Sequence, residues 1–235
     1  MMDLLAQHAR RFGWDLTAQQ ITAFQTYYEE LEAWNQRVNL TGIAGLEAVQ
    51  IKHFLDSLTC LLAFPPGSGQ KVIDVGSGAG FPGLPIRIVR PDIRLTLLEA
   101  VGKKTDFLHH IVDRLGLSEV TVVTGRAEDA GRDPQHREQY DVALARAVAE
   151  LRILAEYTLP FCRVGGLVIA PKRAAIDEEL ASAARAIATL GGALRARVPI
   201  ELPGVEPRQL VVLDKIAPTP ARYPRRAGMP ERRPL

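Results

Sequence analysis

Cysteine is scarce in this 235-residue sequence, which contains only Cys60 and Cys162. The two lie far apart without metal-ligand spacing, so we expect neither a disulfide framework nor a metal site, and a reducing cytoplasm fits. Long hydrophobic runs are also missing: no apolar stretch approaches the roughly 18 residues of a membrane span. Residues 1–14 lack the apolar core of a secretory signal. These absences predict a cytoplasmic protein without a membrane segment.

Basic and acidic side chains nearly balance along the chain, and an excess of one sign occurs only at the C-terminal end. The net charge is +2, yet residues 215–235 hold six basic side chains and one acidic side chain. The preceding 214 residues hold 23 basic and 26 acidic side chains. A concentrated positive field suits a polyanionic partner, although a solvated basic end explains it equally well. Five prolines in residues 218–235 argue against a regular helix, so we expect an extended basic strip there, with the alternative that YPRRAG packs back on the domain and supports the fold.

Hydrophobic spacing divides the rest of the chain into two parts. Residues 1–64 are predicted to form a helical N-terminal segment, because Thr17 and Gln20 have capping-box spacing and a helical stripe follows them. Residues 65–217, after a Pro-Gly linker, are predicted to form a Rossmann-like domain. Residues 218–235 are the tail. The predicted helical stripe consists of Ile21, Phe24, Tyr28, Leu31 and Trp34.

Strand and helix patterns alternate through the predicted domain, which is typical of an α/β fold with a parallel, doubly wound sheet. The last two strands, about 194–202 and 209–216, are joined by a Pro-Gly turn and should pair antiparallel. The other expected strands are 71–76, 94–99, 120–125, 140–145 and 167–172, and the expected helices are 84–90, 103–116, 150–161 and 177–191.

The run IDVGSGAGFPG (73–83) predicts a nucleotide-binding turn between a strand and a helix. Its glycines permit positive φ angles and close backbone approach to a ligand, which binds beyond the carboxyl ends of parallel strands. The G-x-G-x-G spacing lacks the third glycine of a dinucleotide fingerprint. An acid before the turn would attract the cationic end of S-adenosylmethionine and repel a pyrophosphate. The predicted ligand residues here are Asp74, Gly76, Ser77, Gly78, Gly80 and Phe81.

Three further positions follow from the order of the strands. Glu99 ends the next strand and is placed to accept hydrogen bonds from ribose hydroxyls. Ala127 and Glu128 follow the third strand, where an adenine edge would rest, unless Glu128 only stabilises a helix N-terminus. Arg146 ends the fourth strand, beside the predicted methyl-transfer site, unless it is a surface arginine paired with Glu150.

The chemistry is narrowed by motifs that the sequence lacks. No Asn-Pro-Pro-Tyr or Asp-Pro-Pro-Tyr run follows the fourth strand, which disfavours exocyclic amines, and no Pro-Cys pair offers a ring-carbon nucleophile. An aromatic ring nitrogen with a free lone pair remains, and its methylation needs positioning rather than a base. His109 and His110 are expected on a helix surface or in packing, and His53 is expected to form a structural pair with Asp56.

Several stretches together resemble the RsmG family, formerly glucose-inhibited division protein B. They are NQRVNLTGI (35–43), HFLDSL (53–58), residues 73–92, LLEAVGKKTDFL (97–108), GRAEDAG (125–131) and YPRRAGMPERRPL (223–235). The resemblance implies a class I methyltransferase fold with a seven-stranded sheet. It also implies S-adenosylmethionine-dependent methylation of guanine N7 in 16S ribosomal RNA, naked or within the small ribosomal subunit.

The resemblance also assigns residues. It implies that Gly76, Phe81, Ala127, Glu128 and Arg146 contact S-adenosylmethionine and that Glu99 and Ala100 contact its nucleoside part. A methyltransferase acting on a small molecule or protein, and a non-catalytic nucleotide sensor, are the alternatives. The oligomeric state is open, with a monomer favoured. The residues implied to face RNA are Lys103, Lys104, Arg126, Lys172, Arg222, Arg225, Arg226, Arg232 and Arg233.

Overall fold

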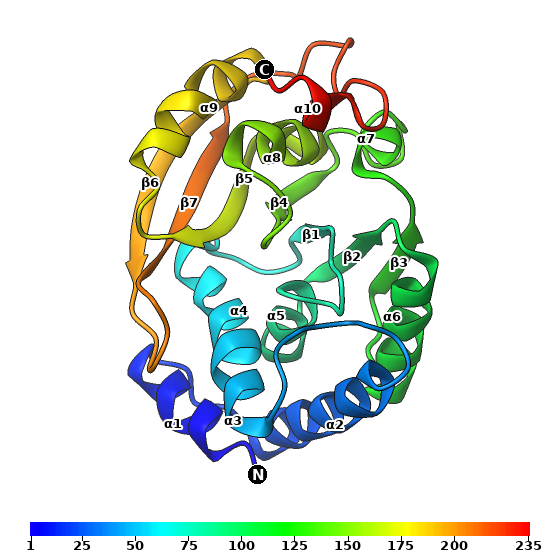
Figure 1. The fold of residues 1–235 in the computed structure, drawn as a ribbon, viewed down its shortest axis with the longest axis vertical. Coiled ribbons are helices and arrows are strands. Elements are labelled where there is room, and N and C mark those ends of the chain that lie inside the picture. Colours follow the sequence, from blue (N-terminus) through cyan, green and yellow to red (C-terminus); the bar gives the residue numbers. More distant parts are fainter.

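A twisted sheet of seven strands crosses the molecule in the order β3-β2-β1-β4-β5-β7-β6, in a computed structural model that describes residues 1–235 (Figure 1). Neighbouring strands from β3 to β5 pair in parallel, whereas β7 pairs antiparallel with both β5 and β6. The predicted doubly wound sheet and its antiparallel end are therefore confirmed. The strands are β1 (Lys71–Val75), β2 (Arg94–Glu99), β3 (Val120–Thr124), β4 (Tyr140–Leu144), β5 (Cys162–Arg173), β6 (Gly192–Ile200) and β7 (Arg208–Lys215).

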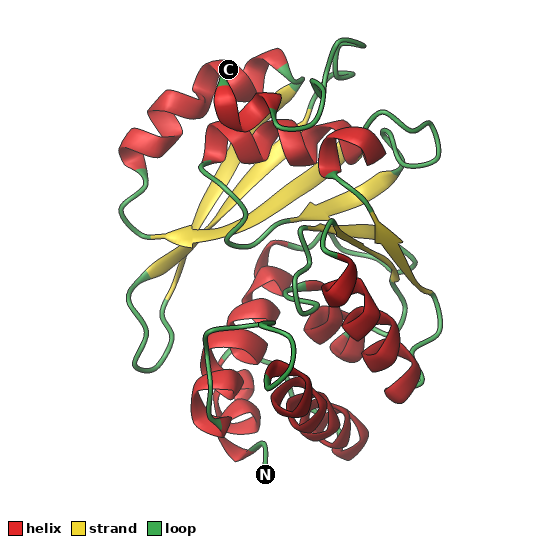
Figure 2. Ribbon diagram, turned by 45° about the vertical axis from the view of Figure 1, so that its right-hand side comes forward, coloured by secondary structure: helices red, strands yellow, loops and turns green.

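Helices cover both faces of the sheet (Figure 2). The central strands are apolar on both faces because each face is buried under a helical layer: Val72 and Val142 belong to one core, and Ile73 and Ala143 to the other. One layer contains α8 (Leu151–Thr158), η3 (Leu159–Phe161) and α9 (Asp177–Thr189), with the short α7 (Ala127–Ala130) near it. The opposite layer contains α5 (Gly83–Val89) and α6 (Gly102–Arg114).

The N-terminal helices extend this second layer rather than standing apart from it. Figure 1 shows the first of them below α5 and α6 and the last of them beside α5, and they share one hydrophobic core with the sheet. Their π-helical turn begins at Gln50, inside an otherwise continuous helical stretch from Leu46 to Ala63. No helix is both long and apolar enough to cross a membrane. The elements are α1 (Asp3–Arg11), α2 (Ala18–Asn35), α3 (Leu46–Val49), the π turn η1 (Gln50–Leu55), α4 (Asp56–Leu58) and the 3₁₀ turn η2 (Thr59–Ala63).

Helix α2 begins as predicted and packs the predicted stripe against the core, together with one residue that the stripe omitted. Thr17 accepts a hydrogen bond from the Gln20 amide and Gln20 accepts one from the Thr17 amide, so the capping box is confirmed. Of the predicted stripe, Phe24 and Leu31 are buried, but Tyr28 is only half-buried. Tyr27, which the stripe omitted, is completely buried and donates its hydroxyl hydrogen bond to the Ala79 carbonyl in the glycine turn.

The tail folds back over α8, so the expectation of an extended, helix-free strip is wrong. Tyr223 is buried, and Arg225 forms a 2.6 Å ion pair with Glu156 of α8. A single turn, α10 (Met229–Arg232), follows with Pro230 near its start. A proline is compatible with that position because the first amides of a helix have no intrahelical partner. The physical reason for the packing is Glu156, a buried carboxylate on α8 that needs a cation.

Candidate active site

The glycine-rich turn that joins β1 to α5 has the backbone conformation that its glycines predict. Gly76, Gly78 and Gly80 have φ angles of 71°, 58° and 93°, which side chains with a Cβ rarely adopt. The Gly76 and Ser77 amides donate to the Leu98 carbonyl on β2 at 2.8 and 3.1 Å. The turn is thus anchored to the carboxyl end of β2, which brings it close to Glu99.

The Glu99 carboxylate links the turn to the start of α6. Its two oxygens accept hydrogen bonds from the backbone amides of Gly78 and Val101, each at 2.9 Å. The side chain is therefore held in place, yet each carboxylate oxygen has a second acceptor position. A ribose with two vicinal hydroxyls has the donors that such a fixed carboxylate can accept.

A cavity of about 110 Å³ opens beside Glu99 at the carboxyl ends of β1, β2 and β3. It brings together five of the predicted ligand residues, namely Gly76, Glu99, Ala100, Ala127 and Glu128. Val148 covers one side, since a Cβ placed on Gly76 would lie 2.9 Å from a Val148 methyl group. The cavity is smaller than the roughly 300 Å³ at the lower end of ligand pockets. A nucleoside with a long substituent is thus larger than this cavity.

The other six predicted ligand residues do not line this cavity, namely Asp74, Ser77, Gly78, Gly80, Phe81 and Arg146. The Asp74 carboxylate is completely buried beneath the turn and accepts a 2.8 Å hydrogen bond from the Gly83 amide at the start of α5. Burial raises the pKa of Asp74 to about 7, against the hydrogen bond from Gly83 and the charge of Arg146, which lower it. Phe81 is buried between the rings of Tyr27 and His53. Both side chains support the turn from below instead of lining the cavity.

Arg146 follows β4 and points into a cluster on the N-terminal helices. Its Nη1 lies 2.9 Å from Asp56 Oδ2 and 3.1 Å from the Lys52 carbonyl, and its Nη2 lies 2.9 Å from His53 Nδ1. The guanidinium carbon also lies 5.0 Å from the centre of the Phe81 ring. The alternative of a surface ion pair with Glu150 is wrong, because the Arg146 side chain is only 11% exposed and pairs with Asp56.

His53 is the second member of this cluster, and its partner is not the predicted one. Its ring stacks on Phe81 with centroids 4.2 Å apart and planes 4° apart, and its Nε2 lies 2.7 Å from Thr41 Oγ1. Burial, together with the Arg146 charge, lowers the pKa of His53 to about 3. The imidazole is thus neutral at physiological pH, with Nδ1 accepting from Arg146 and Nε2 donating to Thr41. The expected His53–Asp56 pair is replaced by contacts of both residues with Arg146.

The tail forms part of the cavity rim. The Gly228 amide donates a 2.7 Å hydrogen bond to Glu128, whose side chain is 1% exposed, and Glu231 lines the cavity beside Tyr157. Burial alone would raise the Glu128 pKa, but the hydrogen bonds from Gly228 and Arg126 bring it below its ordinary value. Glu128 is therefore a buried carboxylate shared by the cavity and the tail, a contact that its place at a helix start did not predict.

The cationic side chains that were predicted to face RNA differ in their exposure to solvent and in their ion pairing. Lys103 is exposed and Lys104 half-buried in the first turn of α6, and Arg126 is 45% exposed while it contacts Glu128. Lys172 is instead engaged, with its Nζ 2.6 Å from both Glu179 Oε1 and the Ala149 carbonyl. In the tail Arg225 is held by Glu156, whereas the exposed arginines are Arg222, Arg226, Arg232 and Arg233.

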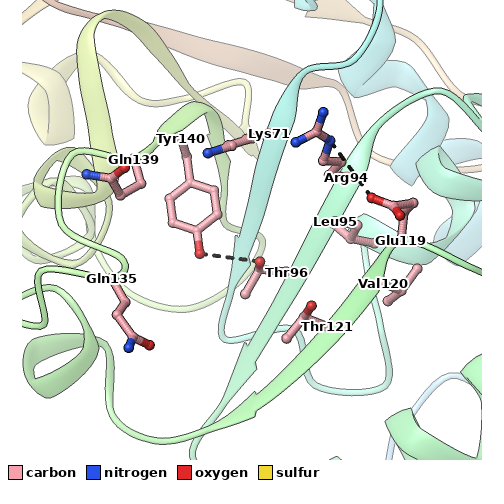
Figure 3. Close-up of a pocket in the computed structure, with 10 residues that line it drawn as sticks. All are labelled: Lys71, Arg94, Leu95, Thr96, Glu119, Val120, Thr121, Gln135, Gln139 and Tyr140. Atoms are coloured by element: carbon pink, nitrogen blue, oxygen red, sulfur yellow. Dashed lines mark hydrogen bonds and ion pairs between the residues drawn. The ribbon is translucent and has the colours of Figure 1, made fainter.

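A separate cavity of about 440 Å³ lies at the opposite, amino-terminal edge of the sheet (Figure 3). Lys71 and Arg94 stand at the first positions of β1 and β2, and Tyr140 at the first position of β4 hydrogen-bonds to Thr96. Glu119 lies 3.8 Å from Arg94 and compensates its charge. Ligands of open parallel sheets bind at the other edge, so this cavity is not the candidate active site.

Known proteins resemble this chain in both sequence and fold. A family model described as rRNA small subunit methyltransferase G matches residues 20–201. The ribosomal RNA small subunit methyltransferase G of Roseiflexus sp. strain RS-1 is 56% identical over 234 residues, which cover 100% of each chain.

Two solved structures share the fold at low sequence identity. A methyltransferase from Pyrococcus furiosus has a TM-score of 0.58 at 13% identity, with 82% of this chain and 98% of that chain covered. TYW2 from M. jannaschii, solved in complex with AdoMet, has a TM-score of 0.54 at 14% identity, with 68% and 74% covered. The class I methyltransferase fold that the sequence predicts is thus confirmed. With its sequence matched along its whole length, the chain belongs to the ribosomal RNA small subunit methyltransferase G family.

Proposed function

We propose that this protein transfers a methyl group from S-adenosylmethionine to N7 of a guanine in 16S ribosomal RNA of the small ribosomal subunit. The observation that carries the proposal is the cavity between Gly76, Glu99 and Glu128, at the carboxyl edge of a class I methyltransferase sheet. Family membership supports the RNA substrate. A ribosomal substrate in turn supports a cytoplasmic location.

The residues of the cavity suit the parts of S-adenosylmethionine, which supplies an electrophilic methyl group when it is bound. Glu99 accepts hydrogen bonds from the ribose hydroxyls, and Ala100 packs beside the nucleoside. Ala127 and Glu128 border the adenine, and Gly76 allows the carboxypropyl end to approach the backbone. Ser77, Gly78 and Gly80 shape this turn, and Asp74 and Phe81 hold it from beneath.

The acceptor side of the reaction lies toward Arg146. Guanine N7 carries a lone pair and no proton, so the protein has to position the base and does not have to deprotonate it. Asp56 and His53 fix the Arg146 guanidinium, and His53 is neutral and cannot repel it. Arg146 lines the methyl-transfer site in this proposal, as a residue that touches the guanine and holds its N7 toward the methyl group.

Exposed cations near the cavity supply the surface for RNA. Lys103 and Lys104 occupy the first turn of α6, where a positive charge opposes the helix dipole and does not serve the helix itself. Arg126 and the tail arginines Arg222, Arg226, Arg232 and Arg233 complete this surface. Lys172 and Arg225 contribute through their ion pairs with Glu179 and Glu156, which fix β5 and the tail beside the site.

The proposal is tested by mapping the methyl group. Purified protein is incubated with S-adenosylmethionine carrying a labelled methyl group and with 16S ribosomal RNA from cells that lack this protein. Nucleoside mass spectrometry should find one new 7-methylguanosine in the RNA. Label that appears only in protein or in small molecules, or a methyl group on another RNA atom, would contradict the proposed reaction.

A further inference from the structure

A third cavity, of about 630 Å³, lies at the carboxyl edge of the sheet on the side away from Glu99. It is formed by the end of β5, the loop between β6 and β7, and the π turn η1. Its volume falls within the roughly 300–1,000 Å³ range of ligand pockets. Three of its lining residues are the cations Lys52, Arg173 and Arg208, and Glu206 is the one carboxylate among them.

This cavity adjoins the cluster around Arg146 through two of its cations. Lys52 immediately precedes His53, and its carbonyl accepts a 3.1 Å hydrogen bond from Arg146. Arg208 Nη1 lies 3.5 Å from Oδ1 of Asp56, the carboxylate that also holds Arg146. Lys52 and Arg208 therefore lie close to the position that the proposed function gives to the guanine.

The charges of the cavity are poorly compensated by the protein itself. Arg173, the last residue of β5, and Arg208, the first residue of β7, stand directly opposite each other in the antiparallel pair. Like charges in that relation destabilise a sheet. Lys52 and Arg173 are exposed, and neither side chain forms an ion pair or a hydrogen bond in the structure. These two exposed cations beside Arg208 leave a local positive charge that an anion can neutralise.

We infer that this cavity binds backbone phosphates of the ribosomal RNA strand next to the methylated guanine, an inference that rests on the proposed function. Lysine and arginine bind phosphate oxygens, and arginine does so with two parallel donors. The amino-edge cavity of Figure 3 also contains a lysine and an arginine, Lys71 and Arg94, but it lies at the opposite edge of the sheet and Glu119 compensates Arg94. It therefore provides a matched comparison.

The test compares two double variants that each remove one lysine and one arginine. Lys52→Ala with Arg173→Ala removes the two unpaired cations and leaves Arg208, which contacts Asp56, in place. Lys71→Ala with Arg94→Ala removes the same charge at the other edge. For each protein, equilibrium affinity for unmethylated 16S ribosomal RNA is measured across a salt series, alongside S-adenosylmethionine affinity and methylation of the same RNA.

The carboxyl-edge variant should bind the RNA on the order of tenfold more weakly near 0.1 M salt, and its slope of log affinity against log salt should be shallower by about one to two. Lys52→Arg with Arg173→Lys should restore most of the affinity, because the charges return. The amino-edge variant should bind as the unchanged protein does, and S-adenosylmethionine affinity should be unaltered in all.

The outcomes separate the inference from the proposed function. If the unchanged protein methylates N7 and the two double variants lose equal RNA affinity, or neither loses any, the phosphate site is refuted while the proposed function stands. If Lys52→Arg with Arg173→Lys loses as much RNA affinity as the alanine variant does, the phosphate site is also refuted, because packing rather than charge is then responsible. If the unchanged protein neither binds nor methylates the RNA, both proposals fall.

Discussion

Asp56 of α4 holds Arg146 at the end of β4 through a 2.9 Å contact between Oδ2 and Nη1, although 90 residues separate them. The two side chains are 2% and 11% exposed, so the ion pair is shielded from water. A buried pair of this kind contributes little net stability, but loss of one partner is costly because the other charge remains buried. The contact fixes the N-terminal helices to the segment that follows β4.

Arg146→Ala should therefore lower both stability and turnover. Removal of one partner of a buried pair costs about 3–5 kcal/mol, and Arg208, at 3.5 Å from Asp56, should keep the loss near the lower value. If Arg146 positions the guanine, the turnover number should fall by more than the RNA affinity does. Denaturant unfolding, RNA binding and single-turnover methylation measure the three quantities.

Arg152→Ala is the control for this experiment. Arg152 forms an exposed pair with Glu150, so its loss should change stability by no more than about 0.5 kcal/mol and leave turnover intact. An Arg146→Ala protein with normal turnover would show that Arg146 only stabilises the packing of the N-terminal helices on the sheet.

Glu99→Gln should lower the affinities for S-adenosylmethionine and S-adenosylhomocysteine by similar factors, because both ligands carry the same ribose. The amide keeps one acceptor oxygen and loses the other, so either Gly78 or Val101 also loses its partner. A hydrogen bond to a charged acceptor is worth roughly 1.5–3 kcal/mol, which corresponds to more than a tenfold loss of affinity. Calorimetric titration of both ligands, with Glu119→Gln at the other edge as a control, tests this. A selective loss of one ligand would place Glu99 at the sulfur end.

The sequence was sufficient for the succession of strands and helices along the chain and for the place of the glycine turn, because hydrophobic periodicity and glycine spacing are local signals. It was not sufficient for Asp74 or His53. Asp74 lies two residues before the first glycine, and only the packing of α5 decides that its carboxylate points to Gly83 and not into the cavity. His53 and Asp56 are close in sequence, but their shared partner Arg146 is brought to them by tertiary folding.

The burial of Tyr27 and the partner that docks the tail could not be predicted, for the same physical reason. Tyr27 is completely buried because the glycine turn and Phe81 pack on it, and a helical stripe read along one element cannot contain that contact. The tail prolines exclude a long helix, but they carry no information about Glu156, the buried carboxylate to which Arg225 binds.

Asp74→Asn should change how stability depends on pH. The folded pKa of Asp74 is about 7, above its ordinary 3.8, because the carboxylate is buried. An acid whose pKa is raised on folding favours the folded state fully at low pH, and that contribution is lost as pH rises from about 4 to about 7. An asparagine does not titrate, so the unfolding free energy of the variant minus that of the unchanged protein should increase across this window.

Denaturant unfolding at several pH values between 5 and 8 measures this difference. Asp92→Asn is the control, since the hydrogen bond from Arg90 lowers the pKa of Asp92. The stabilising contribution of Asp92 is present above its ordinary pKa near 4 and is lost only below that pH. The unfolding free energy of Asp92→Asn minus that of the unchanged protein should therefore stay constant from pH 5 to 8. A constant difference for Asp74→Asn as well would mean that Asp74 titrates in the ordinary range.

Deletion of residues 222–235 should lower both the melting temperature and the affinity for S-adenosylmethionine. The deletion removes the Arg225–Glu156 pair and the buried Tyr223 ring from the core, at a cost of about 3–5 kcal/mol. For a chain of this size, that cost corresponds to a fall of roughly 6–20 °C in melting temperature. It also removes the Gly228 amide from Glu128 and Glu231 from the cavity rim, so cofactor affinity should fall.

A second variant distinguishes the contribution of the tail to stability and cofactor binding from its contribution to RNA binding. Arg222, Arg226 and Arg232 are exposed, and replacing all three by alanine leaves the Arg225–Glu156 and Gly228–Glu128 contacts in place. This variant should keep its melting temperature and cofactor affinity, while RNA affinity falls and its salt slope becomes shallower by up to about three. If the triple variant binds RNA with the original slope, the tail serves the fold alone. If the deletion leaves melting and cofactor binding untouched, the docked tail contributes nothing to the site, and its arginines act as the free strip that composition alone suggested.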